Sequence, residues 1–184
     1  AGEDMIAVTG GNAHIGMIVS DTDDSAQRLR MEGFLSAINP HKNMIVEETF
    51  ESRSDRIRIR KLVSGMLQDN KRINAIFCAD QTAADMLGDI LQEEGYSKNN
   101  MKVVCFGMSR EIYKYLQDGT YTFSVMNDTV EMGYQAVKTL KDCINGKSGE
   151  KRIVYTEIEN ADKDFDFESW KAEWENRERS CMMS

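Results

Sequence analysis

Two features of the sequence could take part in nucleotide chemistry. Residues 9–16 read Thr-Gly-Gly-Asn-Ala-His-Ile-Gly, a glycine-rich stretch of the kind that lets a backbone approach a phosphate. Tyr134 and Lys138 lie four residues apart, so on a helix the lysine can lower the pKa of a tyrosine that donates a proton. Such a combination would suit hydride transfer with a nicotinamide cofactor.

The glycine-rich stretch resembles the cofactor loop of the short-chain dehydrogenases, and Tyr134 and Lys138 fit their YxxxK pair. A phosphate-binding loop, however, follows a strand and opens a helix, so that the phosphate meets free N–H groups. Here residues 15–19 predict a strand directly after the loop, and His14 stands where a glycine would let the cofactor approach. An NAD(P)-dependent dehydrogenase therefore remains only the last alternative.

Other catalytic patterns are missing from the sequence. It contains no GxSxG elbow, no P-loop and no cysteine or histidine spacing typical of zinc. His14 and His41 lie near the starts of predicted strands, away from the end of an open sheet where ligands bind. We therefore predict a protein that is not an enzyme and uses no metal or cofactor.

Composition narrows the class of protein further. The chain has 184 residues, 41% hydrophobic and 29% charged, with a formal net charge of −8. This acidity argues against binding of nucleic acid or anionic membranes, and no apolar run is long enough for a membrane helix. Cys78 and Cys105 fall in predicted strands, which favours free core thiols and a reducing compartment. An exported protein from an oxygen-free habitat would fit them as well.

The elements that must position any site alternate along the chain. Strands are predicted over residues 14–19, 43–49, 74–79, 101–106, 121–126 and 152–158, and helices over 24–38, from an N-cap at Ser54, from Thr82, over 111–117 and over 129–145. The last of these helices is expected to turn Met132, Val137, Leu140 and Ile144 towards a core. The alternation predicts an α/β fold, a Rossmann-like lobe whose parallel sheet is flanked by helices on both faces.

Five motifs, in order, resemble the ribose-binding-protein family, which belongs to the same superfamily as the lactose repressor. They occupy residues 15–34 (a strand, a polar loop and an RxxGF-type helix start), 75–81, 102–107, 118–125 and 132–137. The resemblance covers about residues 12–160 and implies the second lobe of a two-lobed periplasmic sugar-binding protein. Residues 1–13 would then be a partial entry helix and connector from a missing first lobe, 14–150 the ligand-binding lobe, and 151–184 a crossing strand and charged C-terminal helix.

The resemblance also implies binding roles for particular residues. Arg30 would donate two hydrogen bonds to ligand hydroxyls, Asp80 stands at the position of a ligand-binding asparagine, and Asn127 at that of a glutamine. Each has a structural alternative. Arg30 could pair with Asp23 or Asp24, Asp80 could cap the following helix, and Asn127 could be a turn residue.

Loops that follow predicted strands complete the candidate site, because an open α/β sheet binds ligands beyond the carboxyl ends of its strands. They add Asp21, Ser54, Gln81 and Ser109. By resemblance, Ser54 matches a position that can carry a stacking phenylalanine, which serine cannot replace. Gly107 falls where the family often has an aspartate that accepts from the sugar, so the pattern for a pentose or hexose is incomplete.

The family resemblance implies a function in binding a sugar-like solute, either for an ABC importer or for an extracellular sensor. The implied partners are the missing first lobe and a membrane permease or kinase module, and the implied location is extracellular or periplasmic, with a possible membrane anchor. The alternative is the cytoplasmic effector domain of a lactose-repressor-type regulator, with no nucleic-acid contact from this segment. Trp170 and Trp174 share a helix face in the charged tail, which either docks on the lobe or meets an absent part.

Overall fold

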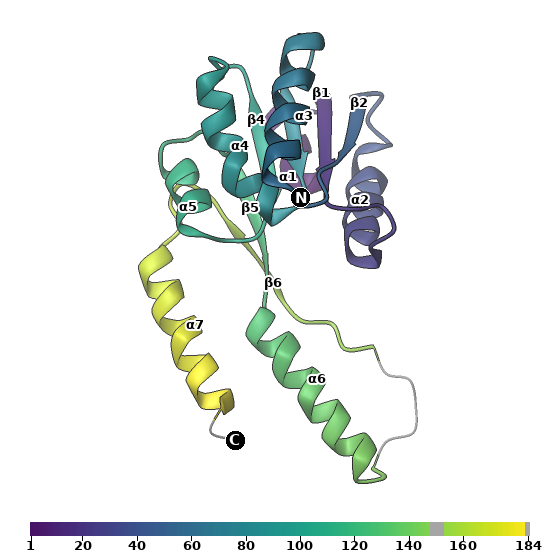
Figure 1. The fold of residues 1–184 in the computed structure, drawn as a ribbon, viewed down its shortest axis with the longest axis vertical. Helices are drawn as coiled ribbons and strands as arrows, with labels where there is room; N and C mark the ends of the chain where they lie inside the picture. Colours follow the sequence, from purple (N-terminus) through teal and green to yellow (C-terminus); the bar gives the residue numbers. More distant parts are fainter. Residues whose placement is uncertain (148–152, 183–184) are drawn as a thin grey trace. The chain divides into compact units, whose positions relative to one another are not determined.

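The computed structural model describes residues 1–147 and 153–182 of the chain. Strands and helices alternate, as the sequence predicts (Figure 1). In chain order the elements are α1 (Gly2–Thr9), β1 (Asn12–Val19), α2 (Ser25–Ile38), β2 (Asn43–Glu51), α3 (Arg56–Asp69), β3 (Ala75–Cys78), α4 (Gln81–Glu93), β4 (Lys102–Phe106), α5 (Arg110–Gln117), β5 (Phe123–Asn127), α6 (Thr129–Ile144), β6 (Ile158–Ala161) and α7 (Phe167–Met182).

The chain divides into two compact units. The first comprises Ala1–Val125 together with Asn160–Asp164, and the second comprises Met126–Glu159 together with Phe165–Ser184. The sheet has six strands in the order β2-β1-β3-β4-β5-β6. The pairs β1–β2, β1–β3, β3–β4 and β4–β5 are parallel, which confirms the predicted parallel α/β fold.

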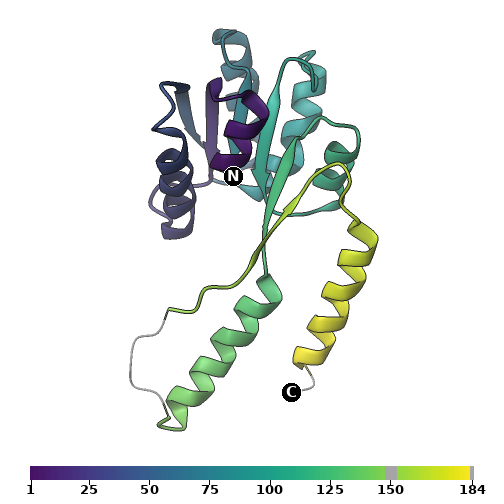
Figure 2. The same cartoon turned by 180° about the vertical axis from the view of Figure 1, so that it is seen from behind.

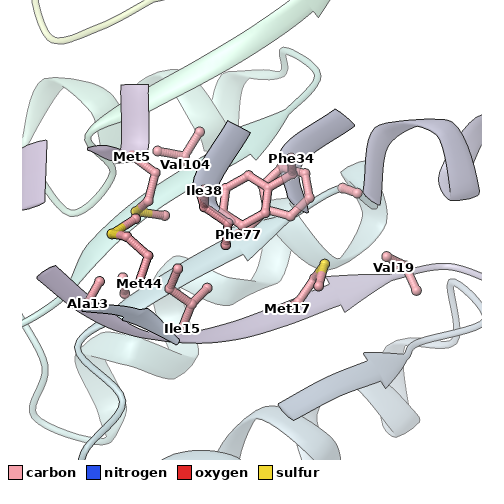
Figure 3. Packing of buried hydrophobic residues seen from close by; sticks show 12 residues of the cluster. Met5, Ala13, Ile15, Met17, Val19, Phe34, Ile38, Met44, Phe77 and Val104 are labelled. Carbon is pink, nitrogen blue, oxygen red and sulfur yellow. The ribbon is translucent and has the colours of Figure 1, made fainter. Parts of the chain in front are cut away.

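Helices of the first unit cover both faces of its sheet. Alternate residues of β1, among them Ile15 and Met17, pack with Met5 of α1 and Phe34 of α2 (Figure 3). The rings of Phe34 and Phe77 stack with their centroids 4.0 Å apart. On the opposite face α3 approaches the sheet, since a Cβ at Gly16 would lie 2.4 Å from the sulfur of Met66. The two views agree, with α3 and α4 in front of the strands in Figure 1 and α1 in front in Figure 2.

Turn chemistry explains where the helices stop. Gly10 ends α1 in a left-handed conformation with φ 64°, and Gly95 follows α4 with φ 80°, both favourable for a residue without a side chain.

The predicted strand at 152–158 is wrong in its bounds. Arg152 lies outside the described residues, and β6 begins only at Ile158. Because Ile153, Val154 and Tyr155 are apolar, their run was indistinguishable from a strand in the sequence.

The expected inward face of α6 is also wrong for this chain. Met132, Val137, Leu140 and Ile144 are all exposed, and α6 has no buried residue. Among the described residues of the second unit, the helical elements are α6 and α7, so this unit offers no sheet face against which α6 could bury its stripe. In α7, Trp170 contacts the rings of Phe165 and Phe167, whose centroids lie 6.0 Å and 5.8 Å from its own.

Candidate functional site

The polar loops of the first unit follow the carboxyl ends of neighbouring parallel strands. Residues 20–24 follow β1, 52–55 follow β2, 79–80 follow β3 and 107–109 follow β4. Parallel pairing brings these four ends to one edge of the sheet. Main-chain bonds join the first two loops, because the N–H groups of Ser52 and Arg53 donate to Val19 O (2.8 Å) and Ser20 O (2.7 Å).

Asp80 is the buried centre of this edge, with 4% of its surface exposed. Its Oδ2 accepts from the hydroxyl of Ser52, and its Oδ1 accepts from the hydroxyl of Ser54 at 3.2 Å. Oδ1 also accepts from the backbone N–H of Thr82 at 3.1 Å, so Asp80 is the N-cap of α4. The structure thus shows the structural role that the sequence left open, while its ligand-binding role stays a prediction.

Arg30 reaches from α2 across the same edge. Its Nη1 donates to the carbonyl oxygen of Ala79 at 2.8 Å, and its guanidinium carbon lies 4.6 Å from the centre of the Phe106 ring. Burial lowers the pKa of Arg30, and the charges of Asp24 and Asp80 oppose that shift. Asp24 itself caps α2, where its side chain accepts from two backbone N–H groups. Arg30 is therefore a half-buried cation fixed against β3 and β4.

Ser54 corrects one prediction. It does not cap α3, because its backbone is left-handed at φ 51°, whereas an N-cap residue needs an extended conformation. Asp55, at φ −89° and ψ 117°, fills that role, and its Oδ1 accepts from Arg58 N at 2.7 Å. The Ser54 hydroxyl instead faces Asp80, which keeps Ser54 in the candidate site.

Gln81 and Ser109 both make hydrogen bonds that involve the loop after β4. Gln81 Nε2 donates to Met108 O at 3.4 Å, and its side chain occupies the space in which a Cβ at Gly107 would stand. Ser109 caps α5 and donates to Asp85 Oδ1 at 2.6 Å. Burial raises the pKa of Asp85, and the hydrogen bond from Ser109 opposes this shift.

Two predicted residues lie further from these contacts. Asp21 Oδ1 accepts from the N–H of Asp23 at 2.9 Å, a local turn within the loop after β1. Asn127 is the last residue of β5 and belongs to the second unit, so its place in the site stays a prediction. Asp128 next to it caps α6 and forms an ion pair with Arg177 Nη2 at 2.6 Å.

Sequence reasoning missed three residues of this edge. Ser52 is 1% exposed and donates to Asp80. The Phe106 ring contacts the Arg30 guanidinium, and Asp85 accepts a hydrogen bond from Ser109. Ser52 belongs to the loop after β2, and its position after a strand was a usable signal. Nothing in the sequence indicated that Phe106 would support a cation.

The residues that resembled a dehydrogenase do not form such a site. Gly10 ends α1 and β1 starts at Asn12, so the glycine-rich stretch precedes a strand and opens no helix. Tyr134 and Lys138 are exposed on α6 in the second unit. The glycine-rich stretch therefore lacks the strand–loop–helix context that a phosphate-binding loop needs.

At the opposite, amino end of β1 lies a separate polar cluster. His14 Nδ1 is 2.6 Å from Glu47 Oε1, and the Glu47 Oε2 accepts from Arg72 at 3.0 Å and Asn70 at 3.3 Å. The hydrogen bond with His14 is the main cause that lowers the pKa of Glu47, against the opposing effect of burial. This cluster ties β1 to β2 and to the turn before β3, consistent with a structural role for His14.

The described residues form neither a candidate metal site nor a candidate membrane span. No group of three or more His, Cys, Asp or Glu side chains in residues 1–147 and 153–182 could hold a metal ion. Within the same ranges no helix is both long enough and apolar enough to cross a lipid bilayer.

Solved structures show the same architecture. GanP, a glucose-galactose binding protein from Geobacillus stearothermophilus, has 24% identity and a TM-score of 0.83, over 88% of this chain and 57% of that one. An ABC transporter solute-binding protein from Burkholderia graminis, in complex with D-arabinose, has 23% identity and a TM-score of 0.82, over 89% and 57%. The XylFII-LytSN complex contributes a chain with 23% identity and a TM-score of 0.79, over 88% and 57%.

These likenesses show the fold, and the chain spans somewhat more than half the length of each of these structures. GanP and the Burkholderia graminis protein are both binding proteins. No curated protein matches the sequence. The family model described as "Periplasmic binding protein domain" matches residues 1–148, most of the chain. The chain therefore belongs to the periplasmic binding protein domain family.

Proposed function

We propose that this chain is one lobe of a two-lobed solute-binding protein that binds a sugar or related polyol and catalyses no reaction. The parent protein would deliver the solute to an ABC importer or act as an extracellular sensor, outside the cell or in the periplasm. Neighbours of the same fold include the arabinose complex and a protein from Agrobacterium vitis with bound D-fucose. The XylFII-LytSN complex is a precedent for a chain of this fold within a complex.

The observation that carries the proposal is the fixed position of Arg30. A guanidinium has five N–H donors, and a single hydrogen bond to Ala79 O holds Arg30 in place against the Phe106 ring. The remaining N–H groups of the planar guanidinium can therefore donate to neighbouring hydroxyl oxygens of a polyol. Because the cation is already half-buried, binding costs little further side-chain entropy.

A first lobe, as proposed for the parent protein, would account for the exposed face of α6. The solved structures are longer than this chain, which covers 57% of GanP. Met132, Val137, Leu140 and Ile144 are exposed at 48%, 68%, 61% and 77%, although they lie on one helix face. An exposed apolar stripe on a helix usually marks a surface that another apolar surface covers, and we infer that the first lobe covers this one.

A substitution on that stripe tests the inference. We expect Leu140→Asp to leave the thermal midpoint of the isolated chain unchanged, because the side chain is exposed there. The same substitution should lower the midpoint of the two-lobed parent, where the carboxylate would be buried. Equal midpoints for the parent and its variant would contradict the packing of α6 on the first lobe.

The alternative function is an effector domain of a lactose-repressor-type regulator inside the cell. The observation that favours it is the state of the cysteines, since Cys78, Cys105 and Cys143 are all free. Sequencing the reading frame on both sides separates the two functions. A secretion signal upstream supports solute capture or sensing, and a helix-turn-helix upstream supports the regulator.

Ligand titration tests the proposed binding directly. We would measure the two-lobed parent by calorimetry with D-galactose, L-arabinose, D-fucose and D-xylose, and with NADH and NADPH as the dehydrogenase control. Arg30→Ala should lower the affinity for the sugar that binds by at least tenfold, since each lost hydrogen bond to a charged group contributes about 1.5–3 kcal/mol. Arg28→Ala, on the exposed side of the same helix, is the matched control.

Either of two results would overturn this proposal. Binding of a nicotinamide nucleotide alone would reject the binding-protein function, and unchanged sugar affinity in Arg30→Ala would reject the assigned anchor. The isolated chain should bind every sugar of the panel weakly, because one lobe offers only part of the hydrogen bonds.

A further inference from the structure

The turn between β2 and α3 has an unusual backbone. Arg53 and Ser54 have φ values of 53° and 51°, in the left-handed region that favours glycine. A side chain disfavours this conformation, because the Cβ crowds the following carbonyl oxygen. Two such residues in succession are held only where the surroundings determine the backbone.

The surroundings of this turn do hold it firmly. The N–H of Arg53 donates to Ser20 O at 2.7 Å, and the N–H of Ser54 donates to the Ser52 hydroxyl oxygen at 3.0 Å. The side chains of Ser52 and Ser54 both donate to the buried carboxylate of Asp80. The backbone on either side of Arg53 is therefore fixed by partners from two neighbouring strand ends.

The side chain that this backbone carries is largely exposed. Arg53 is 61% exposed, and its Nη2 lies 3.6 Å from Glu51 Oε2, longer than a good hydrogen bond. Glu51 is already engaged, since its Oε1 accepts from the N–H of Thr22 at 3.2 Å and from the Thr22 hydroxyl. The ion pair with Glu51 Oε2 therefore uses only one edge of the Arg53 guanidinium, and most of its five N–H donors can reach another acceptor.

The turn is also connected to the candidate ligand anchor. Arg30 is bonded to Ala79 O, and Asp80, the next residue, binds both serines that flank Arg53. The two guanidiniums thus belong to one hydrogen-bonded edge of the first unit. A strained turn without glycine at such an edge is the kind of outlier from which a functional role is inferred.

We propose that Arg53 is a second ligand-contacting residue, whose guanidinium donates to hydroxyl oxygens of the bound sugar and so helps to set specificity. The inference rests on the proposed sugar-binding function and extends it to a residue that the sequence did not single out. Its firm backbone means that binding needs only the side chain to become ordered.

Replacement of Arg53 by glycine separates a binding role from a structural one. Arg53→Gly removes the guanidinium and also suits the left-handed backbone, so the thermal midpoint of the ligand-free parent should stay the same or rise. Its affinity for the sugar that binds in the calorimetric panel should fall at least tenfold. Arg53→Ala should lose a similar factor, and Arg53→Lys, which keeps the charge without the planar fork, should lose less.

Arg60→Ala is the matched control, because Arg60 is similarly exposed (49%) and pairs with Glu93 on the neighbouring helix α4. Its sugar affinity should change less than twofold. Unchanged affinity in both Arg53→Gly and Arg53→Ala would overturn the inference while leaving the proposed function in place. A lowered midpoint in Arg53→Gly would show a structural role instead. If the unaltered parent bound no sugar of the panel, the proposed function would fail, and this inference with it.

Discussion

Asp80 offers the sharpest test of how this edge is built. Replacement by alanine removes one buried carboxylate that three groups share, namely the hydroxyls of Ser52 and Ser54 and the N–H of Thr82. The change leaves the backbone intact, because alanine tolerates the extended conformation of Asp80 (φ −99°, ψ 117°). Its effect on stability therefore reports the hydrogen-bond network.

The expected magnitude follows from these contacts. Loss of an N-cap costs about 0.5–2 kcal/mol. The Ser52 hydroxyl, 1% exposed, would also lose its acceptor, and an unsatisfied buried polar group costs about 1–3 kcal/mol. We therefore expect Asp80→Ala to lower the free energy of unfolding of the first unit by about 1.5–5 kcal/mol. Asp80→Asn should cost less, because asparagine caps a helix almost as well and keeps one acceptor.

Asp55→Ala is the matched comparison, since Asp55 caps α3 but is exposed. It should lose only the cap contribution, about 0.5–2 kcal/mol. Urea unfolding followed by circular dichroism is the suitable assay, because Trp170 and Trp174 both lie in the second unit and tryptophan fluorescence would report on that unit. Equal losses for Asp80→Ala and Asp55→Ala would refute the argument that Asp80 supports more than a helix end.

Three further predictions concern other parts of the first unit and α6. Gly107→Ala should lower stability by about 1–3 kcal/mol in urea unfolding, because Gly107 has φ +99°, while Gly33→Ala, with open space around it, should be neutral or stabilising. The pKa of Glu47 is lowered in the folded state, so its ionised carboxylate stabilises the fold fully above the unfolded-state pKa of about 4.3. This contribution is lost as the pH falls through the folded-state pKa. Glu47→Gln should therefore flatten the dependence of the unfolding midpoint on pH below about 4.3. Burial raises the pKa of Cys105 to about 12, so mass spectrometry of the native chain after iodoacetamide treatment should find Cys143 alkylated and Cys105 intact; equal labelling would contradict the buried position.

The sequence predicted the architecture well because its signals are local. Apolar runs and helical spacing placed most elements of the first unit within a few residues, for example β4 at Lys102–Phe106 against a predicted 101–106. The same logic predicted that the polar loops share one edge, since loops after parallel strands must gather there. Motif order added the family, which the family model then confirmed.

What the sequence could not supply depends on contacts between distant residues. Ser54 looked like a helix cap because its type is right, and its left-handed backbone depends on Asp80, 26 residues away. The support of Arg30 by Phe106 is likewise a meeting of two elements that no local pattern encodes. The stripe on α6 was identified correctly as apolar, but a pattern does not say whether its partner belongs to the chain at hand.

The hydrogen-bond donors and acceptors at this edge of the sheet indicate which kind of ligand it can bind. The Asp80 carboxylate has about four acceptor sites, and three hydrogen bonds from the protein already use most of them. Arg30 and Arg53, by contrast, bring about ten N–H donors, of which one side-chain bond to Ala79 O is short. Under the proposed function, recognition by this unit would therefore fall mainly to donors, while its buried acid holds the surrounding loops in place. A ligand matched to such an edge presents an array of oxygen acceptors, as a polyol does, and finds its own hydroxyl hydrogens satisfied by groups beyond these two arginines.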